Sequence, residues 1–136
     1  MYIELHAASA FSFLEGASLP EALIERAAAL EYPAMALLDA DGVYGAPRFH
    51  KAARQAGLRP IVGAELTIDP RPPVGERGEA ARPLRAARGG LDPRLRWRLP
   101  VLVETQEGYR NLCRLVTRMK LRASKGEGAL HLDELD

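Results

Sequence analysis

The sequence has a single cysteine, little net charge and no long apolar run. With only Cys113, an internal disulfide is impossible and no zinc-finger spacing exists, which is typical of a reducing compartment. No apolar stretch approaches the roughly 18 residues of a membrane span. Met1 is not followed by a basic and then apolar leader. The sequence therefore indicates neither secretion nor membrane insertion, and we expect a cytoplasmic protein.

A length of 136 residues and a hydrophobic content of 47% suit one globular domain. The formal net charge of +1 argues against nucleic-acid binding over the whole surface. The charge is uneven, because the segment 69–98 holds eight arginines and four acidic residues, a net +4. Within it, the proline-, glycine- and arginine-rich stretch 69–95 cannot build a packed core and predicts a surface insertion. This insertion is either a solvated loop or a local contact to a DNA backbone.

The stretch Met35–Gly45 (MALLDADGVYG) is a short apolar run that ends in two carboxylates and a glycine. Strands of a parallel sheet are buried on both faces, and ligands gather just beyond their carboxyl ends. A helical turn would fit the apolar run equally well, but Pro33 before it and Gly42 after it favour a strand. Asp39 and Asp41 are therefore candidate catalytic residues.

The rest of the chain predicts alternating strands and helices. Ser18 and Glu21 form a capping box at the start of the first helix, and Pro100 favours an edge position or a bulge for the last strand. Short links between the first five elements imply parallel strands with right-handed crossovers, hence an α/β fold. Strands are predicted over Tyr2–His6, in the run from Met35, over Pro60–Ile68 and Arg96–Glu104, and helices over Leu19–Leu30, Pro47–Gly57 and Glu107–Arg122.

Five polar residues lie at or near the predicted strand ends, where a parallel βα array would bring them to one rim. Such nitrogen and oxygen donors could surround a divalent metal ion. The alternative is a set of solvated carboxylates and a hydrogen-bonded structural histidine, and spacing does not decide between them. The five are His6, Glu15, Asp39, Asp41 and Glu65.

Three segments resemble the ordered motifs of the PHP (polymerase and histidinol phosphatase) family. His6–Gly16 (HAASAFSFLEG) resembles its His-x-His-Ser motif with a following acid and glycine, and Leu37–Gly45 (LLDADGVYG) its Thr-Asp-His-Asp motif with a trailing Tyr-Gly. Arg59–Glu65 (RPIVGAE) is similar to the third motif, Lys-Pro-Ile-Ile-Gly-x-Glu. Within the family, the chain most resembles the N-terminus of bacterial DNA polymerase III alpha subunits, in particular their error-prone branch.

The resemblance implies a distorted seven-stranded (β/α) barrel, of which 1–136 would form the N-terminal part, since a closed barrel needs about 250 residues. It also implies that the intact protein is a DNA polymerase in replication or translesion synthesis, with DNA and the other polymerase domains as partners. We expect a fragment or truncated product without the polymerase palm, and a sheet edge left open to self-association.

The family's metal ligands correspond to positions 6, 8, 15, 40 and 65, but Ala8 and Ala40 replace two expected histidines. His6, Glu15 and Glu65 would remain as ligands. Alanine has no lone pair to donate, so the resemblance predicts a non-catalytic scaffold without a cofactor. The alternative is a metal-dependent phosphoesterase or 3′–5′ proofreading exonuclease that uses Zn²⁺ or Mn²⁺ at a rearranged site.

Overall fold

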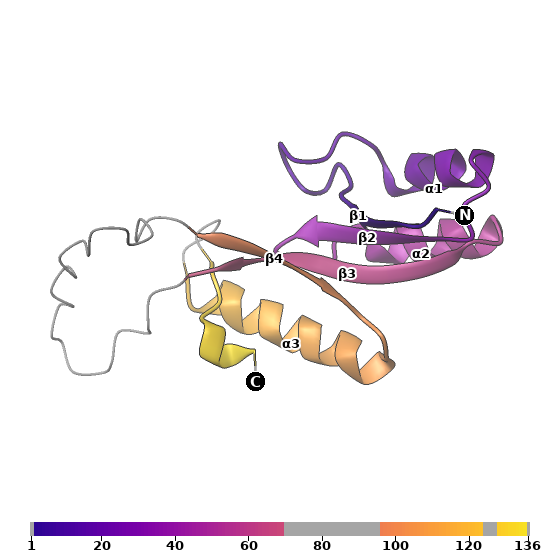
Figure 1. Ribbon diagram of the computed structural model, residues 1–136. Helices are drawn as coiled ribbons and strands as arrows, with labels where there is room; N and C mark the ends of the chain where they lie inside the picture. Colours follow the sequence, from indigo (N-terminus) through magenta and orange to yellow (C-terminus); the bar gives the residue numbers. More distant parts are fainter. Residues whose placement is uncertain (1, 70–95, 124–127, 136) are drawn as a thin grey trace, which may run out of the picture.

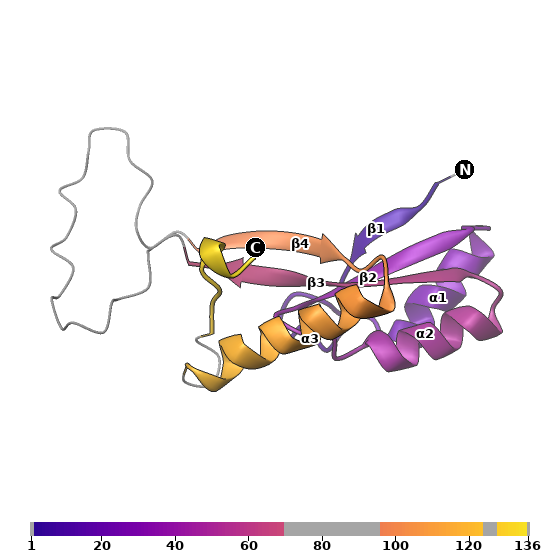
Figure 2. The same cartoon turned by 90° about the horizontal axis from the view of Figure 1, so that it is seen from below.

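The computed structural model describes residues 2–69, 96–123 and 128–135. A curled four-stranded sheet carries helices on one face, as the two perpendicular views show (Figures 1 and 2). The predicted insertion 69–95 lies outside the described residues except for Asp69. The elements in order are β1 (Glu4–Ala7), α1 (Pro20–Ala29), β2 (Ala34–Ala40), α2 (Ala46–Gln55), β3 (Arg59–Ile68), β4 (Trp97–Leu102), α3 (Gln106–Leu121) and the 3₁₀ turn η1 (Leu132–Glu134).

The predicted parallel core of the sheet is confirmed. The strand order is β1-β2-β3-β4, with β1, β2 and β3 parallel and joined through α1 and α2. β4 lies at an edge, as Pro100 predicts, but it runs antiparallel to β3, a direction that the sequence analysis did not assign. The sheet is therefore mixed, and it curls so that β4 approaches β2 across β3.

Two apolar clusters hold the helices on the sheet. Both lie on one face, because registered residues of neighbouring strands point to the same side. The first joins α1 and α2 to β2, and the second joins α3 and the C-terminal segment to β3 (Figure 2). Their buried members are Ile24, Ala27, Met35, Leu37, Phe49, Ala53 and Leu58 in the first, and Ala64, Leu66, Ile68, Leu112, Met119 and Leu130 in the second.

The helix ends correct the sequence analysis at one point, the start of α1. The capping box at Ser18 is wrong, because α1 begins one residue later and its N-cap is Leu19, whose side chain has no acceptor. Pro20 in the first turn lacks an N–H, which reduces the need for a cap. At the other end Glu31 has φ 56°, the strained left-handed conformation in which glycine would be easier. Ala56 is the exposed C-cap of α2.

The C-terminal segment packs against the end of β3. Leu130 is fully buried, donates its N–H to Thr67 and accepts a hydrogen bond from the Asp69 N–H. The 3₁₀ turn η1 follows it. No helix within the described residues is long and apolar enough to cross a membrane.

Candidate functional site

The predicted polar residues lie around the carboxyl ends of the strands, and all of them except Asp39 are on the side of the open face of the sheet, opposite the helices. Strand alternation separates neighbours in β2: Asp39 follows Leu37 toward the helices, whereas Ala40 points to the open face beside Glu65. On β4, Arg98 is opposite Thr67 and two positions from the partner of Glu65, so it lies on the same open face. We call His6, Glu15, Asp41, Glu65 and Arg98 the rim.

His6 and Glu65 form an ion pair across the rim. The His6 Nε2 atom lies 3.2 Å from Glu65 Oε1, and the side chains are 54% and 20% exposed. Because the pair is partly solvated, it contributes little to stability, about 0–1 kcal/mol. The β1 backbone beside it is fixed by Glu4, which accepts hydrogen bonds from the His6 N–H and the Tyr2 hydroxyl, at 2.8 Å each. These bonds, the one from His6 first, lower the pKa of Glu4.

Glu15 pairs with Arg98. The guanidinium Nη2 donates to Glu15 Oε1 at 2.6 Å, from a strand 83 positions later in the chain. The turn that presents Glu15 is tight: Leu14 has φ 66°, and the N–H groups of Glu15 and Gly16 both donate to the Ser12 carbonyl. A Cβ on Gly16 would lie 2.0 Å from the Ser9 carbonyl oxygen, so only glycine fits there.

Asp39 is a buried anchor for the loops around the rim. Its side chain accepts four hydrogen bonds: three reach Oδ1, from the Ser9 N–H, Ser9 Oγ and Ser12 Oγ at 2.8–2.9 Å. The fourth reaches Oδ2, from the Gly45 N–H at 2.7 Å. With 1% of its surface exposed, this carboxylate ties the β1–α1 loop to the start of α2.

Asp41 joins β2 to the end of β3. Its carboxylate accepts hydrogen bonds from the N–H and hydroxyl of Thr67 at 2.7 and 2.8 Å, and its own N–H donates to the Glu65 carbonyl. It has φ 50°, a conformation that aspartate tolerates better than most residues. Asp41 thus points away from Asp39 and toward β3.

The structure brings His6 to Glu65 but ties Glu15 to an arginine. The side chains of Ala8 and Ala40 have no nitrogen or oxygen atom that could bind a metal ion. Within the described part of the chain, no group of three or more His, Cys, Asp or Glu side chains is arranged to hold a metal ion. The residues present at the rim therefore do not fit the metal cluster that the resemblance implies.

Sequence reasoning missed four residues of this site: Ser9, Ser12, Thr67 and Arg98. The two serines follow a strand three positions apart, a pattern typical of side chains that bond nearby backbone, and this signal was available. Thr67 could be paired with Asp41 only once the register of β3 was known. Nothing local to Arg98 indicates its partner.

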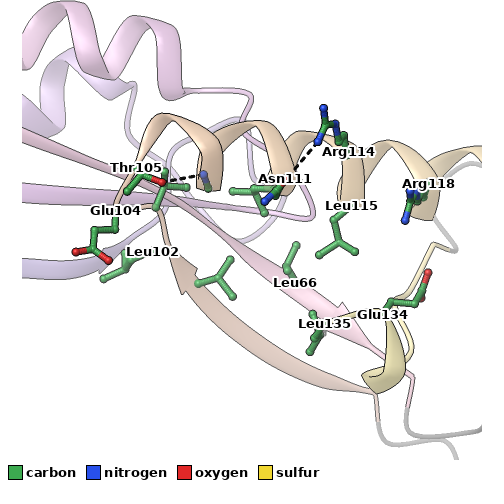
Figure 3. Close-up of a pocket in the computed structure, with 14 residues that line it drawn as sticks. Leu66, Leu102, Glu104, Thr105, Asn111, Arg114, Leu115, Arg118, Glu134 and Leu135 are labelled. Atoms are coloured by element: carbon green, nitrogen blue, oxygen red, sulfur yellow. Dashed lines mark hydrogen bonds between the residues drawn. The ribbon is translucent and has the colours of Figure 1, made fainter.

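A groove of about 690 Å³ opens between α3, β4 and η1. Figure 3 shows Leu66, Leu115 and Leu135 directed into this space, which is also lined by Leu102. Charged residues from α3, the end of β4 and η1 stand at its margins: Glu104, Arg114, Arg118 and Glu134. We call this cavity the α3 groove.

Residues 4–134 match the family described as the PHP domain, which is nearly the whole chain. The chain belongs to the PHP domain family. A solved amidohydrolase from Chromobacterium violaceum, with bound sulfate and no metal, resembles this PHP domain with a TM-score of 0.57 at 22% identity, over 88% of this chain and 33% of that one. This likeness confirms the predicted fold class.

Error-prone DNA polymerases resemble this PHP domain in sequence. That of Anaeromyxobacter sp. (strain K) is 45% identical over 127 residues, which cover 93% of this chain and 9% of the relative. That of Mycolicibacterium paratuberculosis is 44% identical over 135 residues, 98% of this chain and 11% of the relative. This PHP domain thus spans about a tenth of the length of these relatives, and the predicted family is confirmed.

Proposed function

We propose that this PHP domain is a non-catalytic scaffold, the N-terminal part of an error-prone DNA polymerase that acts in replication or translesion synthesis. The rim carries the proposal. Two expected histidines are alanines, Glu15 is held by Arg98, and Glu65 is held by His6. Each missing ligand removes a bond to the metal, and loss of even an outer partner costs about 10–100-fold in metal affinity or activity.

The same proposal assigns Asp39 and Asp41 to structure rather than catalysis. Asp39 has its oxygens occupied by four donors and is buried, so substrate does not reach it. Asp41 holds Thr67 with both oxygens. A carboxylate that acts as a general base must lie within hydrogen-bond distance of the substrate proton that it removes. The carboxylates of Asp39 and Asp41 instead accept hydrogen bonds from their own chain.

The scaffold needs a surface on which other polymerase domains pack, and we assign this task to the α3 groove. Its apolar floor and charged margins are typical of an interface between domains of one chain. The matched relatives are about ten times longer than this domain, so such domains are available in the same polypeptide. Binding to DNA and self-association through the edges at β1 and β4 remain predictions.

Leu135→Gln in the full-length polymerase tests this assignment. Leu135 is 38% exposed at the groove, so the substitution should hardly change the unfolding of the isolated domain. In the full-length protein it should lose about 1–2 kcal/mol of docking, since full burial of a leucine contributes about 1.5–3 kcal/mol. The docked domain should then open 5- to 30-fold more often, measured as faster limited proteolysis between it and the rest of the polymerase.

Leu121→Gln is the matched control, because Leu121 lies on α3, is 82% exposed and does not line the groove. Equal proteolysis of the two variants and the unchanged protein would refute the docking role. A metal-dependent 3′–5′ nuclease activity that His6→Ala selectively abolishes would instead establish the exonuclease alternative.

A further inference from the structure

Arg98 reaches the rim from the strand that follows the insertion. Its guanidinium donates to Glu15 at 2.6 Å, with the two side chains 40% and 41% exposed. Among the described residues, this is the only side-chain hydrogen bond between β4 and the β1–α1 loop. β4 carries Arg98 on the open face because Arg98 is registered with Thr67.

The Arg98 guanidinium lies at a rim that is otherwise rich in carboxylates. The rim holds the carboxylates of Glu15, Asp41 and Glu65, and each has a partner within the chain: Arg98, Thr67 and His6, respectively. In a metal centre the bound ion compensates such charges. Here Arg98 supplies the compensating charge at Glu15, and His6 lies against Glu65. The Glu15 oxygen that accepts the hydrogen bond from the guanidinium is less available to a metal ion, and the positive charge of Arg98 beside it disfavours a second cation.

We propose that Arg98 takes the place of a metal cation at this rim. The guanidinium neutralises Glu15 and links the loop to β4, so the rim is complete without a bound ion, and Arg98 would repel one. This inference rests on the proposed scaffold function and adds a residue with a defined role. It implies that restoring the two histidines alone does not rebuild a metal site, because Arg98 still holds Glu15.

The test compares four chains of 136 residues by calorimetry with Zn²⁺: the unchanged sequence, Ala8→His/Ala40→His, and this double variant with either Arg98→Gln or Arg48→Gln. Arg48 is the matched control. It also pairs with a glutamate, Glu21, at 2.6 Å, with side chains 48% and 46% exposed, but through α1 and α2. Removing Arg98 should strengthen Zn²⁺ binding about 5-fold over the double variant, because a partly exposed ion pair contributes up to about 1 kcal/mol, and removing Arg48 should leave it unchanged.

Equal Zn²⁺ affinity after Arg98→Gln and Arg48→Gln would overturn the inference. Circular dichroism melting verifies that each variant folds, and the single Ala8→His background gives the same comparison if both histidines together prevent folding. Tight binding of Zn²⁺ by the unchanged chain, lost in His6→Ala, would refute the proposed scaffold function instead. The two failures are thus distinguishable.

Discussion

Asp39→Ala should destabilise this domain more than a substitution of any rim residue. Four donors lose their acceptor, and two of them, the N–H groups of Ser9 and Gly45, belong to backbone that cannot rotate to find another. Each buried donor left without a partner costs about 1–3 kcal/mol, so we expect a loss of about 3–5 kcal/mol in the free energy of unfolding. Urea denaturation followed by circular dichroism measures it.

Asp39→Asn is the matched control because it keeps the shape of the side chain. The amide oxygen can retain the three bonds at Oδ1, but the amide nitrogen would then face the Gly45 N–H, donor against donor. The asparagine variant should therefore fall between the native protein and the alanine variant, with a loss of about 1–3 kcal/mol. Stability of the alanine variant within 1 kcal/mol of the native protein would contradict the anchoring role.

Local pattern was sufficient to predict the helices and strands, because the residues that end them are chemically distinctive. Pro47 near the start of α2 and Gly57 at its end, with φ 76°, bound that helix as expected. The antiparallel direction of β4 had a weaker signal. Parallel neighbours need a long crossover, usually helical, whereas the sequence before β4 predicted no helix. That observation favours an antiparallel strand and was available from the sequence.

The candidate site was predicted less well, for two different physical reasons. The two-residue period of a strand already places Asp39 on the side of Leu37, which belongs to the core, and Ala40 on the other side. The buried role of Asp39 could therefore have been predicted. The pairing of Glu15 with Arg98 could not, because it depends on how β4 returns to the sheet after the insertion.

Gly63→Ala should separate β4 from β3. A Cβ at Gly63 would lie 2.1 Å from the carbonyl oxygen of Val101, where real contacts essentially never fall below 3.0 Å, and 3.1 Å from Cγ of Leu38. The obstructing atom is backbone, so no side-chain rotation relieves the clash. We expect a loss at the upper end of overpacking substitutions, about 3 kcal/mol or more. Thermal and urea unfolding measure it.

Gly108→Ala is the matched control, because the same substitution should here leave the protein at least as stable as the native one. Gly108 lies in the first turn of α3, where a Cβ would meet Thr105 Oγ1 at an ordinary 3.5 Å, and alanine favours a helix by about 0.5–1 kcal/mol over glycine. A Gly63→Ala variant as stable as the native protein would show that β4 adjusts without strain.

Because β4 also carries Arg98, displacement of this strand should free Glu15 from its ion pair. Gly63→Ala in the Ala8→His/Ala40→His background should therefore raise Zn²⁺ affinity in the same direction as Arg98→Gln, by moving the strand instead of removing the charge.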